Sequence, residues 1–426
     1  MTEAVDIVIV GAGAAGLTAA IWAGRTAPGR TVLALDGARK LGMKLLVSGG
    51  GRCNVTFHEV SGDAFAGSSP HAIRKVLQQF GLLRTIRFFR EIGVELKQEE
   101  TGKLFPTTDS ARTVLDALVR AAAGAGVTIR HPCRVEAIRR IQGGYSVSGS
   151  WGEVRARRVI LASGGQSLPR SGSDGYGYKL ATDLGHTTTR TFPALVPLIL
   201  PRGFFIRELS GLSARVTLEL RSGSGKRIAA FTDSLLCTRF GVSGPVALNI
   251  SRYYIDAING DAGASLTVNW LPGERLEDVD AMLRLPGRKS LGRLLRSRLA
   301  ERLARALCAE SGVDPSVPGH QLRREQRRLL AEALVAMPLP VCGDRGFGSA
   351  EVTAGGVPLR ELNLRTMESR LSPGLRLCGE ICDVDGPVGG FNLQWAWSSG
   401  CVAGRSAGVS ADPRAQGRED RAPRPR

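Results

Sequence analysis

The run Val5-Asp6-Ile7-Val8-Ile9-Val10 leads directly into Gly11-Ala12-Gly13-Ala14-Ala15-Gly16. Its first six residues are rich in β-branched side chains and predict a short buried strand of a parallel sheet. Leu17–Ala27 is alanine-rich without interior proline, which predicts a helix, and Thr31–Leu35 predicts a second strand ending at Asp36. This order predicts the start of a dinucleotide-binding α/β domain. A glycine turn without a ligand is the alternative.

Each residue type in this motif has a physical role. Gly11 permits a tight turn, Gly13 lets the backbone approach a pyrophosphate, and Gly16 lets the helix pack closely on the strand. The helix beginning at Ala14 and Ala15 offers unpaired N–H groups to phosphates. A carboxylate at the end of the second strand accepts hydrogen bonds from a ribose diol, which disfavours a cofactor that carries a 2′-phosphate.

Composition excludes several classes of protein. The 426 residues suffice for more than one domain, no segment approaches the roughly 18 apolar residues of a membrane span, and the acidic N-terminus is unlike a signal peptide. We therefore expect a cytoplasmic protein without membrane association. The eight cysteines are scattered and form no C-x-x-C pair, so neither a disulfide framework nor a metal site is predicted.

The formal net charge of +18 is the most unusual property of the chain. Between Arg284 and Arg328, twelve Lys or Arg residues face only four acids, so this stretch carries a surplus of eight positive charges. Such a balance predicts a polyanionic partner, typically nucleic acid. Solvated helices, or a general bias toward arginine, are the alternative.

Further along the chain, the order of elements is typical of FAD-binding domains. Ser48–Thr56 is a glycine-rich loop expected to lie along the cofactor, and Ser69–Ile92 predicts one helix. Val127–Arg130 predicts the third parallel strand. Cys133–Val159 predicts a three-stranded antiparallel meander, and Val159–Gly165 a further buried strand. NAD-only folds lack such a meander, so the predicted fold class is α/β with an FAD-binding Rossmann-type domain, glutathione-reductase-like, containing a β-meander.

The composition then changes and later changes back. Residues 1–190 are predicted as the first part of the FAD-binding domain and residues 191–349 as an inserted substrate domain, a β-barrel followed by basic helices. Residues 350–409 are predicted to return to the first domain, and residues 410–426 to form a disordered tail. In the return segment, Asp383–Asn392 opens a helix with a glycine loop, which suits the electron-rich N1–C2=O edge of a reduced flavin.

Taken together, these motifs resemble the BaiN/YhiN-type flavoproteins, the aminoacetone-oxidase-family FAD-binding enzymes. The resemblance spans nearly the full length, in Gly11–Gly16, Lys44–Thr56, Leu161–His186, Pro193–Leu198, Phe240–Pro245, Val352–Val357, Thr366–Ser369 and Gly379–Gln394. It implies FAD contacts at Gly11, Gly13, Ala14, Ala15, Gly16, Asp36, Lys44, Gly51, Arg52, Cys53, Asn54, Val135, Gly379, Glu380, Asp383, Gly390, Phe391, Asn392 and Leu393. Two departures are small: Asp36 stands where glutamate is usual, and Arg239 follows Thr238 where histidine is common.

The resemblance fixes the cofactor better than the reaction. Members are linked to reduction of C=C bonds in bile-acid-type intermediates, to amine oxidation and to dihydrouridine formation in large-subunit rRNA. The charge selects the last, since a steroid or a small amine does not require a net charge of +18. The leading hypothesis is therefore a flavin-dependent reductase of uridine in rRNA, in which hydride passes to C6 and an acid protonates C5. Phosphate contacts are predicted at Arg239, Arg293, Arg296, Arg323, Arg324 and Arg327.

Several alternatives stay open at this point. Cys53 is the candidate acid, but it is at least as well explained as a packing residue or a backbone contact to the cofactor. A small-molecule flavoenzyme, either an enone reductase or an amine oxidase, and a non-catalytic FAD-containing RNA-binding protein are the competing functions. No second G-x-G-x-x-G opens a helix, so NAD(P)H would act as a transient donor docking at the flavin, or another protein would supply electrons. The sequence does not indicate the oligomeric state.

Overall fold

The computed structural model describes residues 3–284 and 290–409. These residues form two compact units, unit 1 from the residues up to Thr191 together with those from Val352 onward, and unit 2 from Phe192–Glu351. The predicted disordered tail, residues 410–426, lies outside the described residues, as do Arg288 and Lys289 of the basic stretch.

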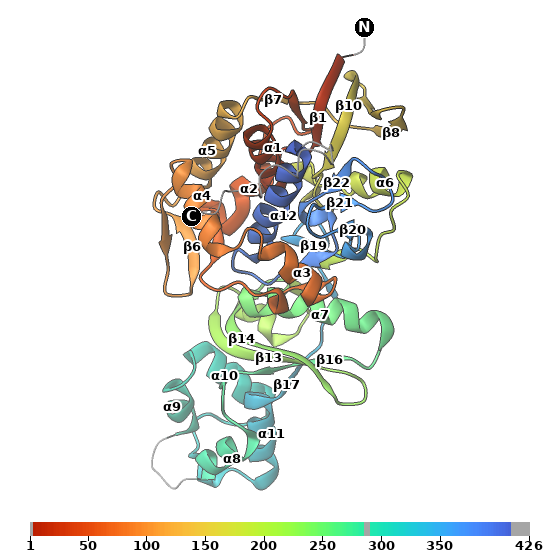
Figure 1. Cartoon of the computed structure of the whole chain (residues 1–426). Coiled ribbons are helices and arrows are strands. Elements are labelled where there is room, and N and C mark those ends of the chain that lie inside the picture. The colour runs from red at the N-terminus through yellow and green to blue at the C-terminus, as the bar shows by residue number, and fades with distance from the viewer. Residues whose placement is uncertain (1–2, 285–289, 410–426) are drawn as a thin grey trace, which may run out of the picture. The chain divides into compact units, whose positions relative to one another are not determined.

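The central sheet of unit 1 has the strand order β20-β21-β22-β10-β1-β2-β7 (Figure 1). Strands β10, β1, β2, β7 and β22 run parallel to their neighbours among these five. Ile7, Val8 and Ile9 of β1 are completely buried, as their β-branched, apolar side chains predict for a strand in the middle of a parallel sheet. The strands of this sheet are β1 (Glu3–Val10), β2 (Val32–Leu35), β7 (Val127–Arg130), β8 (Ala137–Ile141), β9 (Gly144–Gly149), β10 (Gly152–Leu161), β20 (Leu362–Asn363), β21 (Glu368–Ser369) and β22 (Leu375–Leu377).

The antiparallel meander is present, but one strand boundary differs from the prediction. The last meander strand and the apolar strand that follows it were expected as separate elements; the structure has a single strand, β10. Its first half pairs antiparallel with β9, and along most of its length it also pairs parallel with β1, up to Leu161 opposite Val10. One strand therefore connects the meander to the dinucleotide-binding sheet.

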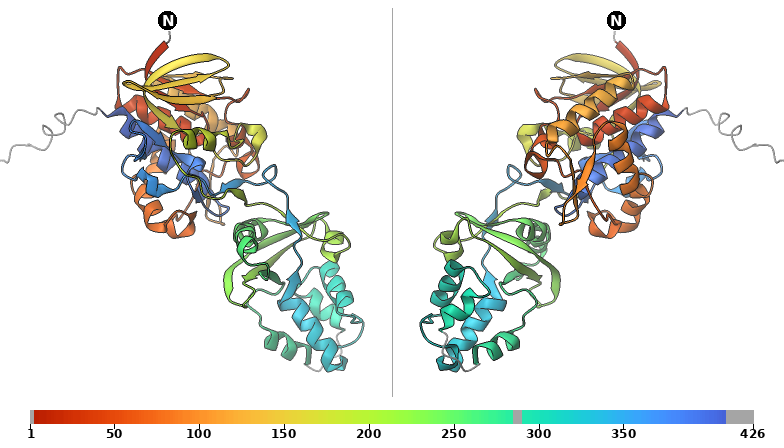
Figure 2. Two further views of the ribbon diagram at one scale, coloured as in Figure 1. Left: turned by 90° about the vertical axis from the view of Figure 1, so that its right-hand side faces the viewer. Right: turned by 90° about the vertical axis from the view of Figure 1, so that its left-hand side faces the viewer.

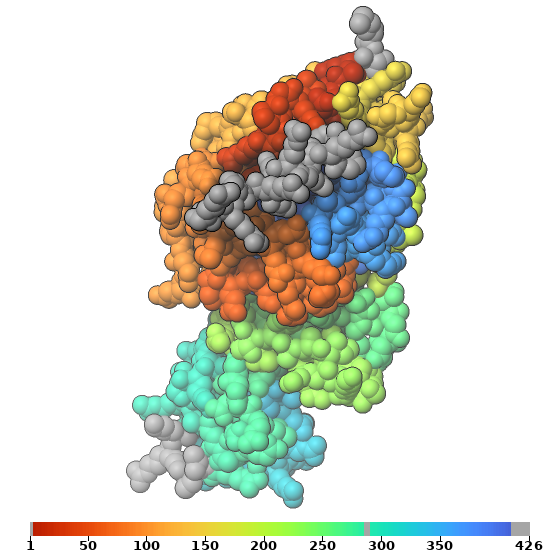
Figure 3. All heavy atoms as spheres, in the orientation of Figure 1, coloured from red at the N-terminus to blue at the C-terminus, as the bar shows by residue number. Residues whose placement is uncertain are grey.

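A second boundary also differs: one helix is predicted at Ser69–Ile92, and the structure has two, α3 (Pro70–Leu77) and α4 (Leu82–Glu91). The Ser69 side chain caps α3 by accepting a hydrogen bond from the Ala72 N–H. Gly81 precedes α4 in extended backbone, so the chain changes direction there. Beside this break, the Gln79 side chain donates to the Leu364 carbonyl, which joins α3 to the return segment; the two segments lie side by side in Figure 3, orange and blue.

Helices α1 (Ala14–Thr26) and α12 (Phe391–Gly408) lie alongside one another in the middle of unit 1 (Figure 1). Gly400 and Gly404 of α12 face α1 so closely that a Cβ atom would lie 2.5 Å from the Ala15 carbonyl oxygen and 2.2 Å from that of Ala19. Nearly all of α12 is buried, which explains why it has no polar face. The glycines thus bring the N-terminal motif and the return segment together.

The remaining elements of unit 1 are short or peripheral. They are α2 (Met43–Val47), α5 (Ala111–Gly124), α6 (Tyr176–Asp183), β3 (Thr56–Phe57), β4 (Ala66–Gly67), β5 (Leu96–Gln98), β6 (Lys103–Pro106), β19 (Val352–Ala354) and β23 (Val384–Asp385).

Unit 2 is built on a sheet with the order β17-β16-β13-β14-β15-β12-β18. The two edge strands, β17 and β18, are consecutive in the chain and pair with β16 and β12, so a short connection links the two edges of this sheet. Figure 2 shows α8–α11 gathered on one side of the sheet. The elements of unit 2 are β11 (Phe192–Ala194), β12 (Leu198–Ile199), β13 (Ser213–Arg221), β14 (Arg227–Thr238), β15 (Gly241–Ser243), α7 (Pro245–Gly260), β16 (Ser265–Asn269), α8 (Leu276–Arg284), α9 (Leu291–Arg296), α10 (Glu301–Glu310), α11 (Arg324–Val335), β17 (Met337–Leu339) and β18 (Gly343–Asp344).

The described residues contain neither a membrane-spanning helix nor a cluster of metal ligands. Across residues 3–284 and 290–409, no helix is long and apolar enough to cross a membrane. In the same part of the chain, no three His, Cys, Asp or Glu side chains gather as a metal site would require.

Candidate functional site

The three glycines of the first motif occupy different surroundings. Gly11 has a φ of +98°, and a Cβ atom there would lie 2.5 Å from the Ala162 carbonyl oxygen. A Cβ atom on Gly16 would lie 1.8 Å from the Gly11 carbonyl oxygen. At Gly13, by contrast, no atom of the described residues beyond its own chain neighbours lies within 4 Å of a Cβ position, and its backbone is an ordinary extended one. Gly11 and Gly16 are thus required by the fold, whereas Gly13 leaves open space beside the N-terminus of α1, where a pyrophosphate fits.

Asp36 lies next to this space and already holds the glycine turn. Its carboxylate accepts hydrogen bonds from the Ala12 N–H (2.6 Å) and the Ala38 N–H (2.8 Å). A carboxylate has about four acceptor positions, so two are left for a ribose diol. The Asp36 carbonyl accepts from the Cys133 N–H, which places the segment that leads to the buried Val135 beside the end of β2.

The glycine loop after α2 exposes backbone, as its sequence predicts. Gly49, Gly50 and Gly51 all have positive φ angles, and Gly50 and Gly51 are exposed. Asn54, at the end of this loop, is buried, and its side-chain oxygen has no hydrogen-bond partner among the described residues. That oxygen lies 2.9 Å from a Cβ position on Gly390. An unsatisfied buried acceptor between the two glycine loops is the feature that a polar cofactor would complete.

Arg52 and Cys53 are held by the protein in other ways. The Arg52 guanidinium forms an ion pair with Glu99 at 2.6 Å and lies 4.0 Å above the Phe105 ring, and the hydrogen bond to Glu99 raises its pKa. Its side chain is therefore directed toward protein groups. The Cys53 thiol is fully buried, and burial raises its pKa to about 12. The structure thus fits the packing role of Cys53 directly, and its role as an acid stays a prediction.

Lys44 and Glu380, 336 residues apart in sequence, form an ion pair. The Lys44 ammonium also donates to the Ser167 hydroxyl, and that hydroxyl donates to the Glu380 carboxylate. The Thr353 N–H donates to the same carboxylate at 2.9 Å. The structure thereby unites two predicted cofactor residues with Ser167 and Thr353, which sequence reasoning missed. Both lie in stretches that were recognised, but as neutral hydroxyl residues they gave no chemical signal of their own.

The start of α12 leaves its first backbone N–H groups uncapped. Gly390 precedes the helix with a φ of +92°, and no side chain caps it. The Asn392 amide instead holds the preceding loop through two hydrogen bonds to Gly386, of 2.8 and 2.9 Å. The Phe391 ring packs 5.2 Å from Phe57, and Leu393 is half-buried. These side chains shape the loop, while the N–H groups remain available to an anionic edge of a cofactor.

Two further residues of the return segment lie close to these elements. Gly379, with a φ of +78°, approaches α1 so closely that a Cβ atom would lie 2.7 Å from the Ala15 side chain. Asp383 is buried, and its carbonyl accepts from the Ser68 N–H. The candidate cofactor site therefore combines three glycine-containing turns, a ribose acceptor and an orphaned amide oxygen, and the residues present fit FAD.

The six arginines predicted to hold phosphates divide into two groups. Arg239, Arg293, Arg323 and Arg324 are exposed, and no carboxylate pairs with them among the residues that the structure describes. Arg296 pairs with Glu301 at 3.4 Å.

Arg327 pairs with Asp280 at 2.6 Å and keeps only 14% of its side chain exposed. It therefore joins α11 to α8, and its position does not support the predicted role in binding phosphate.

Three segments of unit 2 converge around Arg239. The Arg207 guanidinium donates to the carbonyls of Arg239 (2.8 Å) and Leu200 (3.0 Å), which fixes the two loops together. The exposed Arg345 places its guanidinium 4.7 Å from the centre of the Phe240 ring. We call Arg207, Arg239, Phe240 and Arg345 the arginine–aromatic surface. Arginine stacked on an aromatic ring beside further cations is a surface on which unpaired nucleobases stack.

Comparison with known proteins identifies the fold and the family. Residues 5–406 match the family model described as HI0933-like protein Rossmann domain. The chain belongs to this FAD-binding family. It is 34% identical to the ribosomal RNA dihydrouridine synthase of Escherichia coli, over 93% of this chain and 96% of that protein. It is 33% identical to the 3-dehydro-bile acid delta(4,6)-reductase of Clostridium scindens, over 94% of this chain and 98% of that protein.

Solved structures agree with this assignment at the level of the fold. The 3-ketosteroid delta1-dehydrogenase of Sterolibacterium denitrificans superposes with a TM-score of 0.50 and 13% identity, covering 96% of this chain and all of the other. This likeness agrees with the predicted fold class. The family model and the curated relatives confirm the family resemblance, and the protein is an FAD-dependent oxidoreductase.

Proposed function

We propose that this enzyme reduces the C5=C6 double bond of uridine in large-subunit ribosomal RNA. The observation that carries the proposal is the set of exposed arginines on unit 2 that have no carboxylate partner among the described residues, Arg239, Arg293, Arg323 and Arg324. Unpaired surface cations attract phosphates and release counterions on binding. Relatives named as rRNA dihydrouridine synthases, from E. coli and Haemophilus influenzae, support the same substrate at 34% and 30% identity.

In this proposal, unit 1 positions the cofactor. FAD, when bound and reduced by a nicotinamide donor, would supply the hydride. Gly13 would admit the pyrophosphate beside the first turn of α1, and Asp36 would accept hydrogen bonds from the ribose hydroxyls. The uncapped N-terminus of α12 would offer its N–H groups to an anionic edge of the cofactor. The arginine–aromatic surface stacks an unpaired base, so that a uridine released from its helix is available to the enzyme.

The source of the proton is tested separately with Cys53. Because its thiol is buried and its pKa is about 12, it keeps its proton at neutral pH. Replacing Cys53 with alanine abolishes uridine reduction without loss of bound FAD if the thiol protonates C5. If turnover persists at the wild-type rate, Cys53 is a packing residue and another group donates the proton.

A small-molecule C=C reductase is the second candidate function. The 33% identity to a bile acid reductase, almost equal to that of the rRNA-modifying relative, favours it. In that case the arginines of unit 2 would only be solvated, and the affinity for RNA would be weak.

The test compares two substrates, and it also compares variants of two exposed arginines of the same helix, α11. Purified holoenzyme is supplied with NADPH and either unmodified large-subunit rRNA or a steroid enone, and products are measured by mass spectrometry. We expect dihydrouridine with RNA, and we expect Arg324→Gln to lower the rate more than Arg328→Gln, since Arg328 already pairs with Glu332 at 2.8 Å. Turnover of the enone alone would refute the rRNA proposal and support the second candidate.

A further inference from the structure

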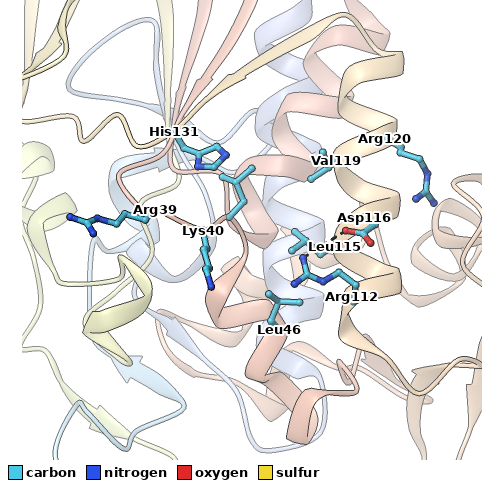
Figure 4. A pocket seen from close by; sticks show the side chains of 10 residues that line it. Arg39, Lys40, Leu46, Arg112, Leu115, Asp116, Val119, Arg120 and His131 are labelled. Carbon is cyan, nitrogen blue, oxygen red and sulfur yellow. Dashed lines mark ion pairs between the residues drawn. The ribbon is translucent and has the colours of Figure 1, made fainter.

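A hollow of about 550 Å³ lies in unit 1 between the chain after β2 and helix α5 (Figure 4). Lys40 and Leu46 stand on one side, and Arg112 and Val119 of α5 on the other. The remaining lining residues are Arg39, Leu41, Leu115, Asp116, Arg120 and His131. None of the residues predicted to contact FAD lines this hollow, although Arg39 and Lys40 follow Asp36 closely in the chain.

The lining is strongly cationic. Four of its side chains are Lys or Arg, whereas Asp116 is its only carboxylate. Asp116 lies 4.0 Å from Arg112, and this is the one ion pair recorded within the lining in the described part of the chain. Lys40 and Arg120, by contrast, have no carboxylate partner among the described residues. Cations gathered without counter-charges repel one another, and a bound anion would remove this repulsion.

The floor of the hollow is apolar. Leu115 is buried, and Leu41, Leu46 and Val119 are half-buried beside it. In Figure 4, Lys40 extends from the chain after β2 and Arg112 from α5, while Arg39 and Arg120 lie at the outer sides of the view. Aliphatic side chains pack against a flat ring, and arginine and lysine hold phosphates. The hollow is open to solvent, its four Lys and Arg side chains are exposed, and its volume leaves room for one nucleotide.

We propose that this hollow binds a phosphorylated nucleotide other than FAD, with its base on the aliphatic floor and its phosphates between Lys40 and Arg112. The nucleotide is either a free one, such as the adenosine half of a nicotinamide donor, or a single nucleotide of a bound RNA. The proposal needs no second glycine motif, because side chains in place of backbone N–H groups supply the phosphate contacts. It also does not depend on the reduction of uridine.

The test uses FAD-loaded enzyme and three probes: ADP, NADPH and a short single-stranded RNA. The variant is Lys40→Gln with Arg112→Gln. The matched control is Arg139→Gln with Arg140→Gln, which removes the same charge from exposed positions of β8 in the same unit. Affinities are measured by calorimetry, together with the FAD content of each protein.

The proposal predicts that the Lys40→Gln, Arg112→Gln variant binds at least one probe at least about tenfold more weakly than the wild type, as expected for loss of a charge-assisted hydrogen bond. The control variant should bind all three probes as the wild type does. Weaker binding of ADP and NADPH assigns the hollow to a free nucleotide; weaker binding of RNA alone assigns it to the nucleic acid. Equal binding of all three probes by variant and control would overturn the proposal. Loss of FAD from the variant alone would also overturn it, since the hollow would then serve the resident cofactor.

Discussion

Replacing Gly13 with alanine separates cofactor binding from folding. The Gly13 backbone is extended, with φ −80° and ψ −164°. Apart from its chain neighbours, no atom in the described part of the chain lies within 4 Å of the new methyl group, so apoprotein stability should hardly change. The methyl group would, however, fill the space assigned to the pyrophosphate. Loss of one charge-assisted hydrogen bond to a phosphate, worth about 1.5–3 kcal/mol, corresponds to about 10-fold to 150-fold weaker FAD binding.

The same substitution at Gly16 provides the contrast. There the methyl group would lie 1.8 Å from the Gly11 carbonyl oxygen, so the backbone must move. At the upper end for overpacking, about 3 kcal/mol, this should lower the Tm of a unit of this size by about 6–12 °C. The assays are thermal unfolding of the apoproteins and FAD titration followed by flavin fluorescence. Wild-type FAD affinity in Gly13→Ala would refute the placement of the pyrophosphate, and an unchanged Tm in Gly16→Ala would refute the packing argument.

Three further outcomes follow from individual contacts. Arg324→Gln should leave the Tm unchanged and reduce the salt dependence of RNA binding by about one unit of slope. Arg327→Gln should lower the Tm, because it removes the half-buried partner of the Asp280 carboxylate and leaves Asp280 with the exposed Arg284 alone. The reverse pattern would contradict the division of the arginines. Gly404→Ala should lower the Tm of the holoenzyme, since the methyl group meets the Ala19 carbonyl oxygen, and an equally stable variant would show that α1 and α12 can separate. Burial raises the pKa of both Cys53 and Cys378 from the ordinary value of 9.0 to about 12. As the pH rises, the unfolded chain therefore releases these protons first, and the free energy of unfolding should fall between about pH 9 and 12, by up to about 1.4 kcal/mol per pH unit for each thiol. Urea unfolding at several pH values checks this sign, and the decline should be shallower in Cys378→Ala.

The parts of the fold that the sequence predicted correctly are those with a strict local requirement. Gly11 and Gly16 have no space for a side chain, so the motif around them identifies the turn and the helix that follows. The break between α3 and α4 was missed, although Gly81 marks it, because the apolar stripe continues across it. The single strand β10 was read as two because its pairing partner changes along its length, and a sequence does not show strand partners.

The site was harder to predict where it depends on distant residues. The Lys44–Glu380 pair joins positions 336 residues apart, and Ser167 enters it through a hydroxyl that sequence patterns do not single out. The basic stretch was recognised from its charge, but only the structure separates Arg327, which pairs with an acid, from Arg324, which has none among the described residues. Charge counts predict a partner class, and ion pairing decides which cations are available to it.

The measurement that tests the central proposal most directly is the dihydrouridine content of large-subunit rRNA from cells that lack this protein. Mass spectrometry of nuclease digests should show the loss of one dihydrouridine, restored by the wild-type chain and restored poorly by Gly13→Ala, whose FAD affinity is expected to be lower. Unchanged dihydrouridine in the cells without the protein would contradict the proposal.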